Sequence, residues 1–328
     1  MARGRGVVNK GAMLVATSKS ATEKLALLEL PSRPLKSGEV RVKTEAIGVN
    51  PVDWKMREGG PLRFAYQLIG PSGPQVVGLD FAGTVIELGA NVTDMAVGDR
   101  VVGGTNFARK QLGSYATEVV ARPDQCAKLP PEVSFDQAAC LPVAAVTAWM
   151  ALREHSKIGP GNKVLVLGAS GGVGHAALQL TKMLGAQAVG VCSTRNVAFV
   201  EQTGAIAVDY TKGDALEAAR PHGPYNLILH AVGTDTYPLG VCRSLLAPGG
   251  RVELVVIRPA DYLAVGFLPS VGTTLGEPTR ERLTPLVAAL ARGDLRPLIA
   301  EKIPLAEAER AHELSRAGKV VGKLLLVP

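Results

Sequence analysis

A glycine-rich turn between an apolar run and a helix is the clearest chemical feature of this sequence. The run Val164-Leu165-Val166-Leu167 predicts a buried strand, and Gly168-Ala169-Ser170-Gly171-Gly172-Val173-Gly174 follows it directly, ahead of an apolar helix. The spacing Ala169-x-Gly171-x-x-Gly174 is the dinucleotide fingerprint with alanine in the first glycine's place. Gly171 and Gly172 allow the backbone to approach a pyrophosphate, and the helix N-terminus supplies free N–H groups and a positive dipole end. Such glycine turns also occur without a ligand, but the order of strand, turn and helix favours nucleotide binding.

The residues after the next predicted strand indicate which nicotinamide cofactor would be preferred. In NAD sites of this kind, an acidic side chain about 20 residues beyond the fingerprint binds the ribose. This chain instead has Cys192-Ser193-Thr194-Arg195-Asn196. Arg195 can hold a 2′-phosphate by charge-assisted hydrogen bonds, and the segment has no carboxylate to repel that phosphate. The sequence therefore favours NADPH; the alternative is that Arg195 is an ordinary exposed arginine at a helix start.

The cysteines do not form a metal-binding or disulfide pattern. Cys126, Cys140, Cys192 and Cys242 are widely spaced, and no C-x-x-C occurs. We expect all four to be reduced and mostly buried, because they resemble isolated small core residues rather than a ligand set.

The elements that must position these residues follow two different patterns. The first third has short β-rich runs separated by turn signals, which is typical of a compact, largely antiparallel domain. Beyond it, predicted strands alternate with helices, which favours a parallel, doubly wound sheet. The predicted strands are 163–167, 188–192, 207–208, 227–229 and 251–257, and the helices between them include 175–184 and 198–203. The tail predicts helices at 284–292 and 306–317, a short strand at 303–305, and a final strand at 323–327 that returns to the first domain.

Composition limits the class of protein. A chain of 328 residues that is 47% hydrophobic can bury a large core and fits two domains better than one. The net charge of +7 comes from scattered residues, which favours a solvated basic surface over nucleic-acid binding. The basic residues 1–6 are not followed by the apolar run of a signal peptide, and no stretch approaches the roughly 20 apolar residues of a membrane span. We therefore expect a soluble, cytoplasmic protein without a nucleic-acid partner.

Several segments, in combination and in order, resemble the medium-chain dehydrogenase/reductase superfamily across nearly the whole chain. They are Ala46-Ile47-Gly48-Val49-Asn50-Pro51-Val52-Asp53-Trp54-Lys55, Gly78-Leu79-Asp80-Phe81-Ala82-Gly83-Thr84-Val85, Val97-Gly98-Asp99-Arg100-Val101, Gly113-Ser114-Tyr115-Ala116-Thr117-Glu118, the stretch from Leu141-Pro142 to Trp149, and Gly318-Lys319-Val320-Val321-Gly322-Lys323. The Asn-Pro-Val-Asp-Trp-Lys segment looks like the zinc-independent, quinone oxidoreductase-like branch, including its chloroplast-envelope and enone-reductase type. The resemblance implies an α/β fold with the active site in a cleft between two domains. These are a GroES-like, mostly antiparallel substrate domain of residues 1–125 and 272–328, and a Rossmann NADPH-binding domain with a doubly wound parallel sheet at residues 126–271.

The resemblance also implies roles for individual residues. The cofactor contacts that it implies come from Thr147, Ser170, Gly171, Gly172, Val173, Ser193, Arg195, Asn196, Tyr210, Ala231, Val232 and Gly233. Tyr210 could equally be a packed tyrosine with an exposed hydroxyl. Asn50 and Lys55 are implied to line the nicotinamide side of the cleft, where either could donate a hydrogen bond to the acceptor oxygen. The alternatives are that Asn50 fixes a turn before Pro51 and that Lys55 is a solvated surface lysine.

Two departures from the family narrow the chemistry. Zinc alcohol dehydrogenases of this superfamily have Gly-His-Glu where this chain has Gly78-Leu79-Asp80, and their closely spaced cysteines are absent here. Without imidazole and thiolate ligands, no metal is expected. Residues 258–278 also match the family poorly, so the wall of the substrate pocket that they would supply is not defined by the sequence.

Without zinc to polarise a carbonyl, hydride transfer needs an acceptor that is already electrophilic. We therefore expect an NADPH-dependent reductase of quinones or α,β-unsaturated carbonyls such as 2-alkenals. Two alternatives stay open: a discrete enoyl reductase for a biosynthetic thioester, and a nucleotide-binding sensor or structural protein without turnover. A homodimer is also expected, because the apolar strand at 251–257 comes late in the sheet and exposed edges of that kind invite pairing.

Overall fold

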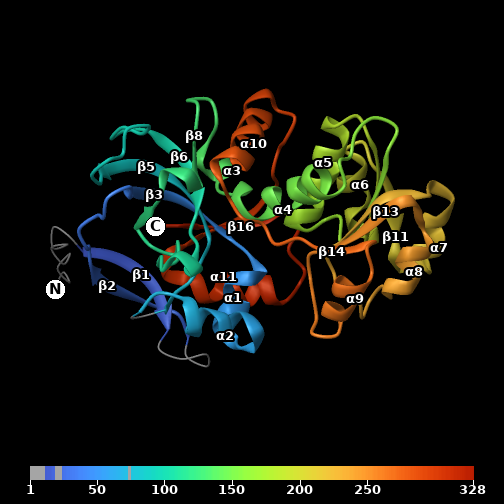
Figure 1. The fold of residues 1–328 in the computed structure, drawn as a ribbon, viewed down its shortest axis with the longest axis horizontal. Helices are drawn as coiled ribbons and strands as arrows, with labels where there is room; N and C mark the ends of the chain where they lie inside the picture. The colour runs from blue at the N-terminus through green and yellow to red at the C-terminus, as the bar shows by residue number, and fades with distance from the viewer. Residues whose placement is uncertain (1–11, 19–23, 73–74) are drawn as a thin grey trace, which may run out of the picture.

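Two sheets of different kinds lie side by side and are joined by a helical segment (Figure 1). The computed structural model describes residues 12–18, 24–72 and 75–328, so the basic residues 1–6 lie outside the described ranges. One sheet is mostly antiparallel and the other is entirely parallel. The predicted fold class is therefore confirmed.

The parallel sheet contains six strands in the order β11-β10-β9-β12-β13-β14. The strands are β9 (Lys163–Leu167), β10 (Gln187–Cys192), β11 (Ile206–Asp209), β12 (Tyr225–His230), β13 (Leu246–Leu254) and β14 (Val271–Thr273). Chain order runs outward from β9 in one direction and then restarts at β12 in the other. Ligands of doubly wound sheets bind at the carboxyl ends of the strands where this reversal occurs. The glycine-rich turn follows β9 and therefore lies at that point.

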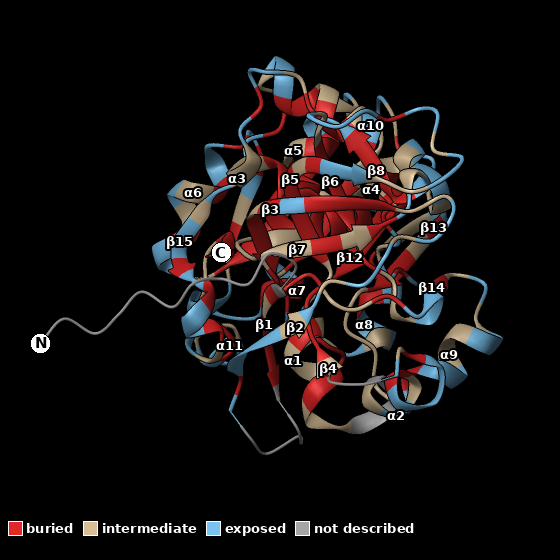
Figure 2. Ribbon diagram, turned by 90° about the vertical axis from the view of Figure 1, so that its left-hand side faces the viewer, coloured by how far each residue is buried: buried red, intermediate tan, exposed pale blue. Residues whose placement is uncertain are grey.

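Helices cover the faces of the parallel sheet, because each connection must cross from the end of one strand back to the start of the next parallel strand. They are α5 (Gly172–Met183), α6 (Val197–Glu201), α7 (Ala215–Ala219), α8 (Leu239–Ser244) and α9 (Asp261–Phe267). Leu178 and Leu180 of α5 are fully buried, in the same cluster as Val164 and Val166 of β9. Figure 2, which faces the antiparallel sheet, shows that its strand β3 (Val40–Val49) is likewise mostly red.

The antiparallel sheet is completed by a strand from the end of the chain. Its order is β15-β16-β3-β5-β6-β8, with β7 paired to β3. The strands are β3 (Val40–Val49), β5 (Asp80–Leu88), β6 (Arg100–Gly104), β7 (Glu118–Ala121), β8 (Cys126–Lys128), β15 (Ile299–Pro304) and β16 (Lys323–Val327). β16 pairs with β3, with Leu325 opposite Gly48. The predicted return of the final strand to the first domain is confirmed.

A smaller sheet and three helices surround this framework. The sheet has the order β2-β1-β4, with β1 (Ala12–Ser18), β2 (Ala26–Pro31) and β4 (Gln75–Val76). The helices are α1 (Pro51–Glu58), α2 (Gly60–Ile69) and α11 (Ala308–Arg316). Short 3₁₀ turns occur at Phe107–Arg109, Pro123–Gln125, Thr194–Asn196, Tyr210–Lys212, Arg220–His222 and Leu305–Glu307.

A continuous helical stretch, Phe135–His155, lies between the two sheets. It consists of α3 (Phe135–Ala138), α4 (Val146–Trp149) and π-helical turns at Leu141–Ala145 and Met150–His155, and α10 (Arg280–Arg292) packs against it. The expectation that no stretch is apolar and long enough to span a membrane was wrong for this segment. However, 78% of its apolar window is buried inside the protein, so core packing accounts for its composition.

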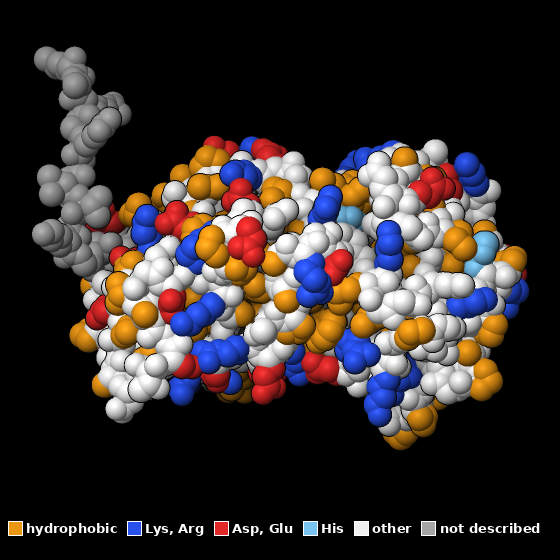
Figure 3. Space-filling model, turned by 90° about the horizontal axis from the view of Figure 1, so that it is seen from above, with side chains coloured by type: hydrophobic (Ala, Val, Ile, Leu, Met, Phe, Trp, Pro, Cys, Tyr) orange, Lys and Arg blue, Asp and Glu red, His pale blue; other side chains and the backbone are white. Residues whose placement is uncertain are grey.

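Two short strands, β8 and β14, determine where each sheet ends. β8 belongs to the antiparallel sheet and β14 to the parallel one, so both domain boundaries lie a few residues later than predicted. β13 is flanked by β12 and β14, so the strand expected at 251–257 is not an edge. On the face shown in Figure 3, Lys and Arg side chains are interspersed with Asp and Glu rather than gathered into one stripe.

Candidate active site

The glycine-rich turn has the geometry that close approach of a ligand requires. Gly168 has φ of +88°, a left-handed conformation that favours glycine. A Cβ on Gly174 would lie 2.2 Å from the carbonyl oxygen of Gly168, so only glycine fits there. By contrast, a Cβ on Gly171 would meet only that same oxygen, at 3.6 Å. The N-terminus of the 12-residue α5 therefore faces open space at Gly171, where an anion can bind its free N–H groups.

The other residues of the glycine-rich turn, Ser170, Gly172 and Val173, also contact the rest of the protein. The Ser170 carbonyl accepts a 2.9 Å hydrogen bond from the backbone N–H of Gly322, and Val173 packs against the core. A Cβ on Gly172 would lie 2.8 Å from Cδ of Lys323. The turn is thus bound to the start of β16, which belongs to the other domain.

The residues that follow β12 lie beside the glycine turn. The backbone N–H of Ala231 donates to the carbonyl of Leu167 at the end of β9. Val232 is partly exposed, and its Cγ1 would lie 2.8 Å from a Cβ on Gly168. Gly233 has φ of +103° and turns the chain away. Ala231, Val232 and Gly233 therefore share one edge of the predicted cofactor site with the turn.

The predicted ribose-binding segment forms a compact turn after β10. The Asn196 side-chain amide donates to Oγ of Ser193 at 3.3 Å, which holds the turn together. Arg195 is exposed, and its Nη2 donates to the carbonyl of Lys319 at 3.3 Å. Tyr210 follows β11 and is 51% exposed, which fits both a cofactor contact and a packed ring with an exposed hydroxyl. Arg195 and Tyr210 are thus both accessible to a ligand.

A carboxylate that sequence reasoning missed lies next to this turn. Thr194 Oγ1 donates to Oδ2 of Asp209 at 2.7 Å, and Lys212 Nζ lies 3.7 Å from the same oxygen. Asp209 is opposite Cys192 in the register of β10 and β11. The parallel pairing of the two strands was the signal that could have revealed it, because their carboxyl ends meet at one sheet edge.

Thr147 lies inside the helical segment between the domains and is buried. Its Oγ1 donates to the carbonyl of Val143 at 2.6 Å. A Cβ on Gly276 would lie 2.6 Å from Oγ1 of Thr147, so the segment after β14 passes directly over Thr147. The poorly matching residues 258–278 fold into α9 and β14 and lead into this cover.

Asn50 caps α1 and is held from three sides. Its Nδ2 donates to Oδ2 of Asp80 at 2.8 Å, and its Oδ1 accepts from Lys323 Nζ at 2.5 Å. Lys323 Nζ also donates to the Val49 carbonyl at 2.9 Å and lies 3.3 Å from Asp80 Oδ2. These contacts fix the orientation of the Asn50 amide and leave one Nδ2 hydrogen without a partner among the described residues. Since Asn50 is only 3% exposed, its contact with an acceptor would be made from a buried position.

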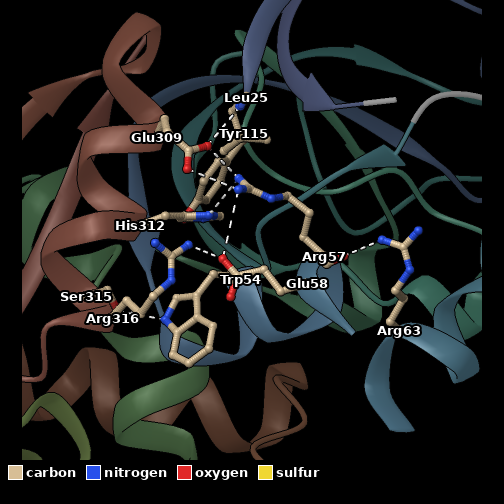
Figure 4. Close-up of polar contacts among 10 residues, drawn as sticks. All are labelled: Leu25, Trp54, Arg57, Glu58, Arg63, Tyr115, Glu309, His312, Ser315 and Arg316. Carbon is tan, nitrogen blue, oxygen red and sulfur yellow. Dashed lines mark hydrogen bonds and ion pairs between the residues drawn. The ribbon is translucent and has the colours of Figure 1, made fainter. Parts of the chain in front are cut away.

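Lys55 lies one turn further along α1 in a different environment. Its Nζ is 5.5 Å from the ring centre of Trp54, and it has no hydrogen-bond or ion-pair partner among the residues that the structure describes. Partial burial lowers the pKa of Lys55. Trp54 is in turn held by Ser315 of α11, as Figure 4 shows. Lys55 is therefore an unpaired donor on a helix that neighbouring elements hold in place.

Comparison with known proteins identifies the family. The alcohol dehydrogenase GroES-like domain matches residues 36–131, and a zinc-binding dehydrogenase domain matches residues 204–326. A chloroplast envelope quinone oxidoreductase homolog from Arabidopsis thaliana is 33% identical over 314 residues, which cover 92% of this chain and 93% of the relative. The chain belongs to the medium-chain dehydrogenase/reductase superfamily.

Two further relatives of this medium-chain dehydrogenase/reductase support the quinone oxidoreductase-like branch and an oxidoreductase function. The structure of the quinone oxidoreductase from Coxiella burnetii has a TM-score of 0.85 at 31% identity, and the match covers 97% of this chain and 99% of that one. A trans-enoyl reductase from Aspergillus terreus is 28% identical and the match covers 88% of this chain and 86% of that one. The family suggests a nicotinamide cofactor.

Although one matched domain is named for zinc, the side chains of this medium-chain dehydrogenase/reductase do not fit a zinc ion. An ammonium group, Lys323 Nζ, occupies the space beside Asp80. Cys126 and Cys140 are buried, and burial raises the pKa of each thiol to about 12, so neither supplies a thiolate. Within the described ranges, no group of three or more His, Cys, Asp or Glu side chains could hold a metal.

Proposed function

We propose that this chain is a cytoplasmic, zinc-independent reductase that uses NADPH to reduce quinones or α,β-unsaturated carbonyls. One observation carries the proposal: two successive residues join the open glycine turn to Asn50, because Gly322 donates to the Ser170 carbonyl and Lys323, the first residue of β16, donates to Asn50. This connection supports a single site in which a dinucleotide on the glycine turn meets nitrogen donors near Asn50. Exposed Arg195 supports the preference for NADPH, because it can pair with a 2′-phosphate.

The hydrogen-bond donors of Lys55 and Asn50 can stabilise an acceptor whose oxygen becomes negatively charged during the reaction. NADPH would supply the hydride, so the protein must orient the acceptor and stabilise the negative charge that develops on its oxygen. Lys55 and the free Nδ2 hydrogen of Asn50 are such donors. Quinones and enones need no further polarisation because they are already electrophilic.

A second candidate function has a specific observation in its favour. The similarity to a trans-enoyl reductase supports a discrete, trans-acting enoyl-thioester reductase, whose substrate is also a conjugated carbonyl. A nucleotide-binding sensor or structural protein without turnover is the alternative from another class. The side chains favour turnover, because Lys55 has no hydrogen-bond or ion-pair partner among the described residues and lies on the helix that Asn50 begins.

A panel of acceptors tests the proposal. Purified protein is mixed with NADPH and a quinone, a 2-alkenal or an enoyl thioester, and absorbance of the reduced nicotinamide is followed. We expect oxidation with the quinone or alkenal. Oxidation with the thioester alone would favour the second candidate, and tight NADPH binding without oxidation by any acceptor would favour the binding protein.

Variants connect the activity to the site. Lys55→Met should lower kcat/KM on the order of a hundredfold, as loss of one oxyanion donor does. Lys43→Met is a matched control, because Lys43 is exposed on β3 and, in the part of the chain that the structure describes, its ammonium group pairs with Glu45 alone. If Lys55→Met and Asn50→Ala both keep full kcat and kcat/KM, neither residue stabilises the transition state.

We also propose a homodimer, now formed through β14 rather than β13. β14 is an edge of the parallel sheet, with unpaired backbone groups that invite pairing. The adjacent α9 exposes Tyr262, Leu263 and Phe267, which an interface would cover. Light scattering at micromolar concentration tests this, and a monomeric mass would contradict it.

A further inference from the structure

Two carboxylates that are fully shielded from solvent hold Asn50 from different elements. Asp53 Oδ2 accepts the backbone N–H of Asn50 at 2.8 Å, and Asp80 Oδ2 accepts its side-chain amide at 2.8 Å. Asp53 and Asp80 are both 0% exposed. The second oxygen of Asp53 has no hydrogen-bond partner among the described residues. Two buried carboxylates therefore both accept hydrogen bonds from the same residue, Asn50.

One cation faces this pair. Lys323 Nζ lies 3.3 Å from Asp80 Oδ2 and is shared with Asn50 and the Val49 carbonyl. Arg57 is engaged elsewhere: its two terminal nitrogens contact the two carboxylate oxygens of Glu309 at 2.7 and 3.1 Å (Figure 4). The Arg57–Glu309 pair is self-neutralised and leaves no charge for Asp53.

His312 is neutral as well. Arg57 Nη1 donates to its Nδ1 at 3.4 Å, so the ring proton lies on Nε2, which donates to the Tyr115 hydroxyl at 3.2 Å. Burial, together with the charge of Arg57, lowers the pKa of His312 to about 3. Tyr115 then donates its own proton to Asp53 Oδ2 at 3.1 Å. The groups facing Asp53 thus leave one excess negative charge, from two carboxylates and one ammonium.

A buried excess charge is strongly disfavoured, and uptake of one proton removes it. We propose, on the basis of the reductase activity proposed above, that Asp53 and Asp80 share one proton at neutral pH and are positioning residues that keep the surroundings of Asn50 neutral while the acceptor becomes anionic. The proton stays on the pair throughout. NADPH, when bound, would supply the hydride, and water would supply the proton that completes the reduced product.

The titration of the pair agrees with this charge balance. Burial, together with the neighbouring charge of Asp80, raises the pKa of Asp53 to about 7. Burial also raises the pKa of Asp80, although Lys323 opposes this shift. As pH rises through the neutral range, the pair loses its proton and places a negative charge near the developing anion. The rate of hydride transfer should therefore fall.

The pH dependence of kcat/KM toward the best acceptor tests the inference. For the wild type we expect a fall of about tenfold or more centred near neutral pH, since one unit charge at about 12 Å changes the rate about tenfold at an effective dielectric constant of about 20, and a nearer charge changes it more. Asp53→Asn should lack this step, because the amide oxygen still accepts from Asn50 and Tyr115 but carries no charge. Any fall at higher pH that remains in the variant belongs to Lys55.

Asp124→Asn is the matched control, because Asp124 is exposed and pairs with Arg109 on the surface. It should titrate like the wild type. The same neutral-pH step in Asp53→Asn and wild type would overturn the inference, whereas a purely structural role for Asp53 would change KM or yield without moving the pH profile.

A second measurement needs neither turnover nor a folded variant. Infrared difference spectra of the wild type between pH 6 and pH 9 should show one buried protonated carboxyl that disappears as pH rises. Absence of this band at the lower pH would overturn the inference. A band in a protein that reduces no acceptor would instead refute the proposed function and leave the shared proton established.

Discussion

Replacing His312 by glutamine should remove a specific source of acid instability. His312 is fully buried, and its pKa is lowered to about 3 by burial, while an unfolded histidine titrates near 6.5. Below pH 6.5 the unfolded chain therefore binds a proton that the folded chain refuses, so stability is lost as pH falls. Each pH unit of this difference corresponds to 1.36 kcal/mol, so between pH 7.5 and pH 5 the side chain alone removes about 2 kcal/mol of the free energy of unfolding.

The variant should lack this slope. His312→Gln should be less stable than wild type at pH 7.5, by about 1–2 kcal/mol, because the contacts with Arg57 and Tyr115 are imperfectly replaced. Between pH 7.5 and pH 5, this difference should shrink by about 2 kcal/mol. Urea unfolding at several pH values measures both quantities. His222→Gln, at a partly exposed position, is the control, and parallel wild-type and His312→Gln stability curves would refute the reasoning.

Three further predictions concern the cofactor site and the metal. Arg195→Ala should weaken NADPH binding by roughly tenfold or more and leave NADH binding nearly unchanged, since a charge-assisted bond is lost; fluorescence titration checks this, and equal losses for both cofactors would contradict it. Gly174→Ala places a methyl group 2.2 Å from the Gly168 carbonyl and should cost on the order of 2–3 kcal/mol of stability in urea unfolding, whereas Gly240→Ala, in open space, should cost little. Activity should survive a chelator, and metal analysis finding one zinc per chain would overturn the zinc-independent assignment.

Local geometry explains why the conformation of the glycine-rich turn could be predicted from sequence. The glycine spacing reports backbone conformation and close packing, and both are visible at Gly168 and Gly174. The alternation of strands and helices likewise predicted the parallel sheet, because short apolar runs between helices are typical of strands that are buried on both faces. The strands β8 and β14 were not predicted, because each has three residues and so short a run has almost no periodic pattern.

The surroundings of Asn50 could not be predicted for a different reason. Its contact with Lys323 joins residues 273 positions apart, and no local pattern encodes such a pair. A buried Asp53 looks the same in sequence as an exposed helix-start aspartate. The position of Asp209 beside the turn at Ser193–Asn196 was missed because it depends on which strand is adjacent to β10 rather than on the neighbours of Asp209 in the chain.

The place of β16 in the structure has a consequence for the order of synthesis. All six strands of the parallel sheet lie between residues 163 and 273, so that sheet can assemble while the rest of the chain is still being made. The antiparallel sheet must wait for β16, although most of its strands emerge from the ribosome first. Its exposed β3 edge needs protection during that interval, and Lys323 completes the Asn50 site only when β16 arrives. Newly made chains should therefore fold the cofactor half early and acquire a working cleft late.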